Sequence, residues 1–214
     1  MRVALINEDS QAGKNSLIYE ILASEAEPRG HEVDNYGMFS EKDEHEINFT
    51  QIGVIASILM ESQAADFIVT GCGTGQGAMI SCNAFSNLVC GYVNTPLDAY
   101  LFSQVNAGNA ISIPFAQYYG WGAEVNLRYV FRALFEQPFG KGYPDEYAEA
   151  ERKSRIKMME WTKRPAQYPI EEVIRRLDQE RLYGLINYKE FKKLFYNNAK
   201  SGKIEKYIKE LLEK

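Results

Sequence analysis

The sequence predicts an α/β protein in which a parallel, five-stranded sheet is covered by helices on both faces and is followed by a helical C-terminal extension. Over residues 1–135, short β-rich runs alternate with segments in which apolar residues recur at helical spacing. Strands that are separated by helices of this length pair in parallel. Beyond residue 147 apolar residues recur at helical spacing, so no further strand is expected.

The first three predicted strands are short runs that end in polar or glycine-rich loops. Residues 3–6 form the first strand, and a polar loop leads from it into a helix over about residues 14–26. A glycine then opens a second strand at residues 30–36. Residues 49–63 have the pattern of a strongly amphipathic helix, and the third strand, residues 67–70, ends at a glycine.

The second half of the sheet continues the same alternation. A helix over residues 77–83 precedes a fourth strand at residues 89–93, and a short helix over residues 96–106 precedes a fifth strand at residues 110–115. A long helix over residues 122–135 follows. Open parallel sheets bind ligands beyond the carboxyl ends of their strands, so we expect the site in the loops after the first, third and fourth strands.

The C-terminal part is predicted to be helical throughout. One helix covers about residues 145–162, and Pro165 and Pro169 separate it from three amphipathic helices. We therefore expect a sheet domain over residues 1–145 and a helical extension over residues 146–214.

Charge is distributed unevenly between these parts. Residues 1–150 hold 7 Lys and Arg against 19 Asp and Glu, a net charge of −12, whereas residues 151–214 hold 17 against 10, a net charge of +7. An acidic body excludes a general nucleic-acid binder, which needs a basic surface. We expect the basic tail to fold back on the acidic body or on a dimer partner.

Three cysteines, Cys72, Cys82 and Cys90, are too few for a disulfide framework, and their odd number favours reduced thiols and a cytoplasmic location. No apolar run approaches the ~18 residues of a membrane span, and the apolar N-terminal run is too short for a signal peptide. The sequence therefore predicts a soluble protein with no membrane partner.

Residues 71–77, with the sequence GCGTGQG, are the most informative segment. Four glycines at alternate positions, after a buried strand and before a helix, let the backbone approach a ligand closely. The N–H groups at such a helix start are suited to an anion or an oxyanion. A tight turn without a ligand is the alternative, although one turn needs fewer glycines.

Cys72 favours a catalytic role for this segment. It lies where the strand ends and the helix field begins, which favours its thiolate, and a thiolate beside N–H donors can abstract a proton next to a carbonyl. Cys82 and Cys90 lie on apolar faces and are expected in the core. A dinucleotide-binding loop is a weaker alternative, because the glycines follow the third strand and no acidic residue ends the next one.

The run Cys72-Gly73-Thr74-Gly75-x-Gly77, followed by Asn83, resembles the signature of the family of type B ribose-5-phosphate isomerases and galactose-6-phosphate isomerases. The resemblance covers roughly residues 1–145 and includes the Asp9 loop, residues 30–33, the turn at residues 37–40, Asn106 and Asn109. It implies a Rossmann-like three-layer α/β/α fold and a metal-free aldose–ketose isomerase without a cofactor. It also implies a homodimer with sites near the interface.

The resemblance further implies roles for single residues. Cys72 is expected to move a proton between C1 and C2 through a cis-enediolate, assisted by the Thr74 hydroxyl, and Asp9 is expected to bind sugar hydroxyls. The expected substrate is a pentose or hexose, most directly a sugar phosphate such as ribose 5-phosphate or galactose 6-phosphate. The expected substrate-binding residues are Gly73, Gly75, Gly77, Gln11, Asn83, Asn106, Asn109 and Lys141.

Two departures from the family pattern leave alternatives open. The position of the ring-opening histidine is Val105, so His45 is a candidate replacement, the other reading being a solvated loop residue; His31 is expected to be structural. The phosphate-binding arginines are also missing, and Lys141 is the basic residue in their segment. An isomerase of a non-phosphorylated sugar and a sugar-binding protein without turnover are therefore alternatives.

Overall fold

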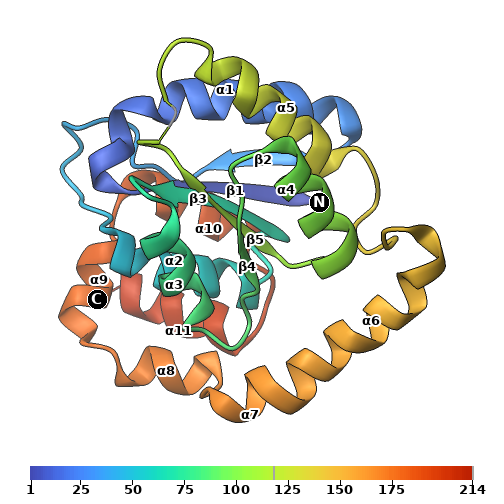
Figure 1. The fold of residues 1–214 in the computed structure, drawn as a ribbon. Coiled ribbons are helices and arrows are strands. Elements are labelled where there is room, and N and C mark those ends of the chain that lie inside the picture. The colour runs from blue at the N-terminus through green and yellow to red at the C-terminus, as the bar shows by residue number, and fades with distance from the viewer. Residues whose placement is uncertain (118, 214) are drawn as a thin grey trace.

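The computed structural model describes residues 1–117 and 119–213 and confirms the predicted α/β class (Figure 1). Within this part of the chain one parallel sheet has five strands in the order β2-β1-β3-β5-β4. Every strand was predicted from the sequence to within two residues of its ends. The strands are β1 (Arg2–Asn7), β2 (Glu32–Asn35), β3 (Phe67–Cys72), β4 (Cys90–Tyr92) and β5 (Ala110–Pro114).

Strand β1 is the point at which the order of the strands reverses. Val3 pairs with Val33 of β2 on one side and with Phe67 of β3 on the other. The loops that leave the carboxyl ends of β1 and β3 therefore turn to opposite faces of the sheet. In open parallel sheets this is the place where a crevice for a ligand forms.

The alternation of side chains along the strands divides the core between the two faces. Val3 and Val69 face a cluster that holds the apolar sides of helices α1 (Asn15–Ala26) and α5 (Ala123–Phe135), whereas Ala4 faces the opposite cluster. Helices α2 (Phe49–Glu61) and α3 (Gln76–Asn83) cover that second face, and α4 (Pro96–Leu101) continues into a π-helical turn, Phe102–Asn106. The result is the three-layer arrangement that the family resemblance implied.

The C-terminal helices belong to the same core as the sheet. Ile174, Phe191 and Ile208 are fully buried and lie in one cluster with Ile52 and Ile55 of α2. Figure 1 shows these orange and red helices beside α2 and α3. The predicted boundary after residue 145 stays a prediction, but the segment is not a peripheral appendage. Its helices are α8 (Ile170–Arg176), α9 (Gln179–Ile186), α10 (Lys189–Asn198) and α11 (Lys203–Leu212).

Two details of the predicted C-terminal part are wrong. Four helices, not three, follow Pro169 within the described residues, because the Asp178 carboxylate accepts hydrogen bonds from two backbone N–H groups and starts α9. Pro165 does not end the preceding helix. It lies in the first turn of α7 (Arg164–Ala166), where the N–H group that proline lacks is not needed by the helix.

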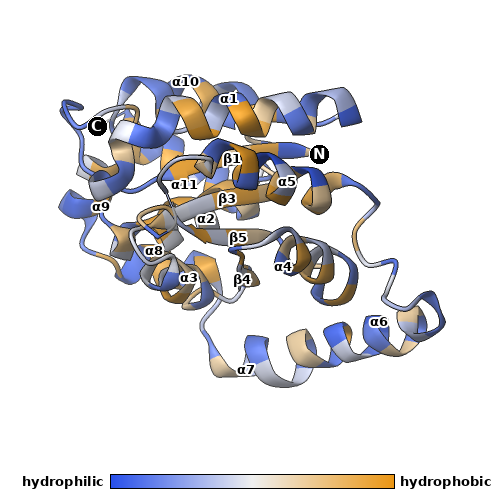
Figure 2. Ribbon diagram, turned by 45° about the horizontal axis from the view of Figure 1, so that its top comes forward, coloured by the Kyte–Doolittle hydropathy of each residue, from blue (hydrophilic) through white to orange (hydrophobic). Residues whose placement is uncertain are grey.

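A helical arm joins the sheet domain to these helices. It runs from a 3₁₀ turn at Asp145–Tyr147 through α6 (Ala148–Lys157) and a π-helical turn (Met158–Lys163) into α7, and none of its described residues is fully buried. In Figure 2 the arm stands apart from the strands along the lower edge of the view. It leaves apolar side chains exposed to solvent, among them Met158 at 55% and Trp161 at 77%.

Candidate active site

The glycine loop after β3 is held on both sides by backbone hydrogen bonds. The carbonyl of Cys72 accepts from the N–H of Phe115 at 3.0 Å, and the carbonyl of Gly73 accepts from the N–H of Ala116 at 3.0 Å. The hydroxyl of Ser112 donates to the carbonyl of Gly75 at 2.5 Å. The end of β5 therefore fixes the path of the loop at the carboxyl edge of the sheet.

Three of the four glycines are explained by packing. A Cβ atom at Gly71 would lie 2.2 Å from the Ile113 carbonyl oxygen, and one at Gly77 would lie 2.7 Å from the Phe49 ring. Gly75 has φ +71, and its Cβ would lie 2.9 Å from the backbone of β5. At Gly73, however, the nearest atoms would be at 3.7 and 3.8 Å, which is ordinary contact. Gly73 is thus the glycine whose missing side chain leaves room beside the loop.

Cys72 lies at the mouth of this loop. The residue is buried, at 6% exposure, and its Sγ atom is 4.0 Å from the hydroxyl oxygen of Thr74. That hydroxyl also accepts a 3.3 Å hydrogen bond from the N–H of Gln76, at the start of α3. The N–H groups of Gly73 and Thr74 have no hydrogen-bond partner within the described residues. A thiol, a hydroxyl and unpaired N–H donors therefore adjoin one another.

The loop after β1 brings polar side chains against the glycine loop. Gln11 is buried, and its Nε2 atom would be 3.8 Å from a Cβ at Gly73. Gln11 Nε2 donates to the Ser10 hydroxyl at 2.9 Å, and that hydroxyl donates in turn to the Glu8 carboxylate. The side chain of Asn48 approaches the Asp9 carboxylate at 3.5 Å. Asp9 and Gln11 thus lie at the same edge as Cys72.

The surroundings of the two acids in this loop shift their pKa values in opposite directions. Burial raises the pKa of Glu8, whereas a hydrogen bond from the Glu8 side chain lowers the pKa of Asp9. Asp9 is therefore the more acidic of the two, and its carboxylate oxygens can accept hydrogen bonds from sugar hydroxyls.

His45 lies in the loop between β2 and α2. Its ring stacks on Tyr188 at a centroid distance of 3.9 Å with an interplanar angle of 5°, and its Nε2 atom is buried without a partner in the described part of the chain. Burial lowers its pKa. The loop adjoins the site because the Asp9 N–H donates to the Ile47 carbonyl at 2.8 Å. A catalytic role for His45 stays a prediction.

The other predicted binding residues lie at the amino edge of the sheet. The Asn83 amide bonds to the backbone of Cys90, and the Asn109 amide bonds to the backbone of Val89 and Asn87. Both side chains therefore stabilise turns in this structure. Asn106 ends the π-helical turn before β5, and Lys141 lies beside the same turn, between two glycines that bond to it.

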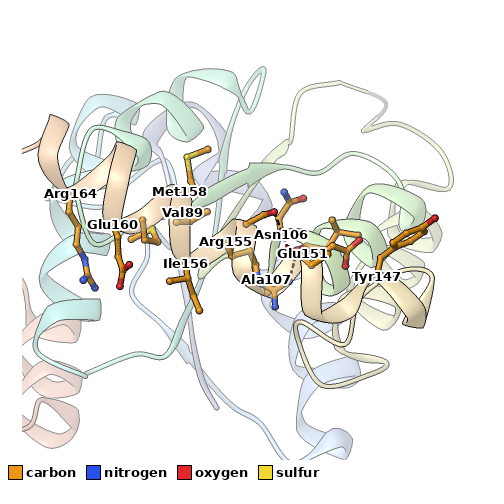
Figure 3. Close-up of a pocket in the computed structure, with 14 residues that line it drawn as sticks. Val89, Asn106, Ala107, Tyr147, Glu151, Arg155, Ile156, Met158, Glu160 and Arg164 are labelled. Carbon is orange, nitrogen blue, oxygen red and sulfur yellow. Dashed lines mark hydrogen bonds between the residues drawn. The ribbon is translucent and has the colours of Figure 1, made fainter.

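A cavity of about 690 Å³ opens at this amino edge between the arm and the sheet domain (Figure 3). Asn106 lines it, together with Arg155 of α6, whose guanidinium donates to the Val105 carbonyl at 2.7 Å. The sequence did not point to Arg155, because the family resemblance places the phosphate-binding arginines in the segment of residues 140–144. The surplus of basic residues beyond residue 150 was the available signal.

No group of three or more His, Cys, Asp or Glu side chains in the described part of the chain could hold a metal ion. No helix there is both long and apolar enough to span a membrane.

Comparison with known families identifies two matches. The profile of the Ribose/Galactose Isomerase family matches residues 3–157, and a profile described as Ribose-5-phosphate isomerase matches residues 169–211. No curated protein sequence matches the chain.

Two solved structures match over nearly the whole chain. A 4-deoxy-L-threo-5-hexosulose-uronate ketol-isomerase, solved with a tartrate, is 45% identical with a TM-score of 0.96, and the match covers 100% of both chains. A ribose-5-phosphate isomerase from Vibrio parahaemolyticus is 42% identical with a TM-score of 0.94, and the match covers 99% of both chains. A type B ribose 5-phosphate isomerase from Trypanosoma brucei, 16% identical with a TM-score of 0.59, shares the fold over 72% of this chain and 97% of its own.

Proposed function

Because the chain belongs to the ribose/galactose isomerase family, a family of sugar isomerases, we propose that it interconverts an aldose and a ketose with Cys72 as the base. The observation that carries this proposal is the position of the Cys72 thiol beside the Thr74 hydroxyl and the unpaired N–H groups of Gly73 and Thr74. A base and donors for an oxyanion are the groups that proton transfer next to a carbonyl requires.

The groups of the glycine loop account for every bond and proton in the proposed reaction. The Cys72 thiolate removes the proton from C2 of the open-chain aldose, the electron pair of that bond forms the C1–C2 double bond, and the C1 oxygen takes up the negative charge. The N–H groups of Gly73 and Thr74 stabilise that oxygen. Cys72 returns the proton to C1, while the proton of the C2 hydroxyl passes through the Thr74 hydroxyl to the C1 oxygen.

The substrate we propose is a sugar acid of the uronate type. The neighbour with 45% identity acts on a uronate. A carboxylate carries one negative charge and a phosphate close to two, so a body with a net charge of −12 opposes a carboxylate less. A sugar phosphate is the second candidate, because the neighbour with 42% identity is a ribose-5-phosphate isomerase.

We further propose that two copies of the chain complete each site. Cys72 lies at the carboxyl edge of the sheet, whereas Asn106 and Arg155 lie at the amino edge, so one copy cannot bring all three to one small sugar. A homodimer in which the arm of one copy meets the glycine loop of the other would do so and would cover Met158 and Trp161.

Exchange of solvent deuterium tests the proposed base. The protein is incubated in heavy water with the uronate, and separately with ribose 5-phosphate, and label at C2 is measured by NMR. Cys72→Ala should lower the exchange rate by about 10²–10⁴-fold, because that is the usual contribution of a general base. Calorimetry with tartrate should show that binding persists in this variant.

Cys82→Ala is the matched control, since it removes a fully buried thiol from α3 and should leave exchange unchanged. Undiminished exchange in Cys72→Ala would remove Cys72 from the mechanism. Binding of the uronate without exchange in the parent protein would favour the alternative, a sugar-binding protein without turnover.

A further inference from the structure

Lys14 ends the 3₁₀ turn (Asp9–Lys14) that follows β1, and it reaches across the carboxyl edge of the sheet. Its ammonium group donates to the Gln11 side-chain oxygen at 2.5 Å and to the Phe115 carbonyl at 2.6 Å, and it lies 4.4 Å from the centre of the Tyr119 ring. Gln11 adjoins Gly73, and the N–H of Phe115 bonds to the Cys72 carbonyl. Lys14 is therefore linked to the glycine loop through one residue on each side, Gln11 towards Gly73 and Phe115 towards Cys72.

Four of the other basic residues in the acidic body are occupied by carboxylates. Arg2 pairs with Glu32 and Asp34. Three arginines surround the Glu25 carboxylate: Arg29, which follows α1, and Arg128 and Arg132 of α5.

The two remaining basic residues of the body are lysines placed elsewhere. Lys141 lies at the amino edge beside the π-helical turn, and Lys42 is exposed in the loop after β2. Lys14 is thus the basic residue of the described body that lies against the glycine loop.

The partners of Lys14 within the described residues are neutral oxygens and a ring, so they do not neutralise its charge. Burial lowers its pKa, although Glu8 nearby opposes that change. An anion that reaches the ammonium group would offset the electrostatic cost of burying its charge. In a body of net charge −12, a cation beside the glycine loop would favour the binding of an acidic sugar.

We propose that Lys14 binds the acid group of the substrate, and that it thereby selects carboxylate-bearing sugars. This assignment rests on the proposed function, in which Cys72 acts at the opposite end of the sugar. Gln11, which lies between Lys14 and Gly73, would contact the middle of the sugar. A lysine presents a point charge rather than the fork of an arginine, which suits a carboxylate approached from one side.

The test compares an acidic substrate with a neutral one. KM and kcat are measured for the uronate and for its methyl ester in the parent, in Lys14→Met and in Lys14→Arg. Lys14→Met should raise KM for the uronate about 10–100-fold while kcat changes less than about 3-fold, and it should leave KM for the ester unchanged. Lys14→Arg should recover much of the affinity. Lys42→Met is the matched control and should behave as the parent.

Binding of tartrate by calorimetry separates this inference from the proposed mechanism. Loss of tartrate affinity in Lys14→Met, together with exchange that survives in Cys72→Ala, would keep the acid-binding role and reject Cys72 as the base. An equal rise in KM for the uronate and the ester in Lys14→Met would show that Lys14 only holds Gln11 in place. That result would overturn the inference and leave the proposal that Cys72 is the base unaffected. Unchanged kinetics in Lys14→Met would overturn the inference as well.

Discussion

Gly73 and Gly75 are two residues apart in the loop after β3, yet they are glycines for different reasons. Gly75 has a positive φ and packs against the backbone of β5, so its identity is set by folding. Gly73 has neither constraint, because a Cβ atom there would lie at ordinary contact distance from Ala116 and Gln11. The same repeated residue type therefore serves the fold at one position and, in our proposal, the ligand at the other.

Substitution by alanine separates these reasons. Gly75→Ala should lower the free energy of unfolding by roughly 1–3 kcal/mol, because the methyl group enters a strained conformation and a close contact. Gly73→Ala should leave stability within about 0.5 kcal/mol of the parent and weaken binding of tartrate. Urea unfolding and calorimetry measure the two effects. Equal stability of both variants would contradict the distinction.

At the scale of single residues, part of the candidate site could be predicted from the sequence, and the roles of its residues stay predictions. The glycine spacing pointed to Cys72, and the structure brings Asp9 and Gln11 to the same edge of the sheet. Lys14 and Arg155 could not be found this way. Each acquires its position from contacts with residues far away in the chain, Phe115 in one case and Val105 in the other.

At the scale of elements, α1 and α5 are joined by one buried carboxylate. Glu25, at 6% exposure, accepts hydrogen bonds from Arg132 of α5 and from Arg29, and Arg128 lies 3.6 Å away. The bond to Arg132 is the main reason that the pKa of Glu25 is lowered. The arginines are about one third to one half exposed, so solvent screens much of the attraction.

The stability that Glu25 contributes should depend on pH. Its folded pKa lies below its unfolded value, so the contribution is present above about pH 4.5 and is lost as pH falls through the folded pKa. Glu25→Gln should lower the free energy of unfolding by about 1–2 kcal/mol at pH 7, and the difference should shrink towards pH 3. Urea unfolding at both pH values measures this. A difference that stays constant with pH, or an equal one in exposed Glu27→Gln, would contradict the account.

At the scale of the whole molecule, the pattern of strands was predictable and the place of the C-terminal helices was not. A short β-rich run of apolar residues between helical segments identifies a buried strand locally. An amphipathic helix, by contrast, shows that one face is covered without showing what covers it. The part of α2 between Ile52 and Leu59 indicates where the C-terminal helices pack, because residues around most of its circumference are buried. Such a helix must be covered on two sides, and the C-terminal helices supply the second.

The expected fold-back of the basic tail on the acidic body occurs, but charge does not carry it. The C-terminal helices fold back on the acidic body, but they do so through apolar packing. The described ion pairs of α8–α11 form within that segment, as between Lys203 and Glu171 or between Lys209 and Glu205. Two basic residues line the cavity at the amino edge of the sheet, Arg155 and Arg164, and both belong to the arm.

The opposite placement of Cys72 and Arg155 in one chain has a genetic consequence. If two copies share each site, Cys72→Ala and Arg155→Ala damage different halves, and a mixed dimer of the two variants contains one site with both halves intact. Random reassortment makes half of the dimers mixed, so two inactive preparations that are unfolded and refolded together should regain roughly a quarter of parental activity. Two such alleles would complement each other in one cell, and absence of complementation would mean that each chain works alone.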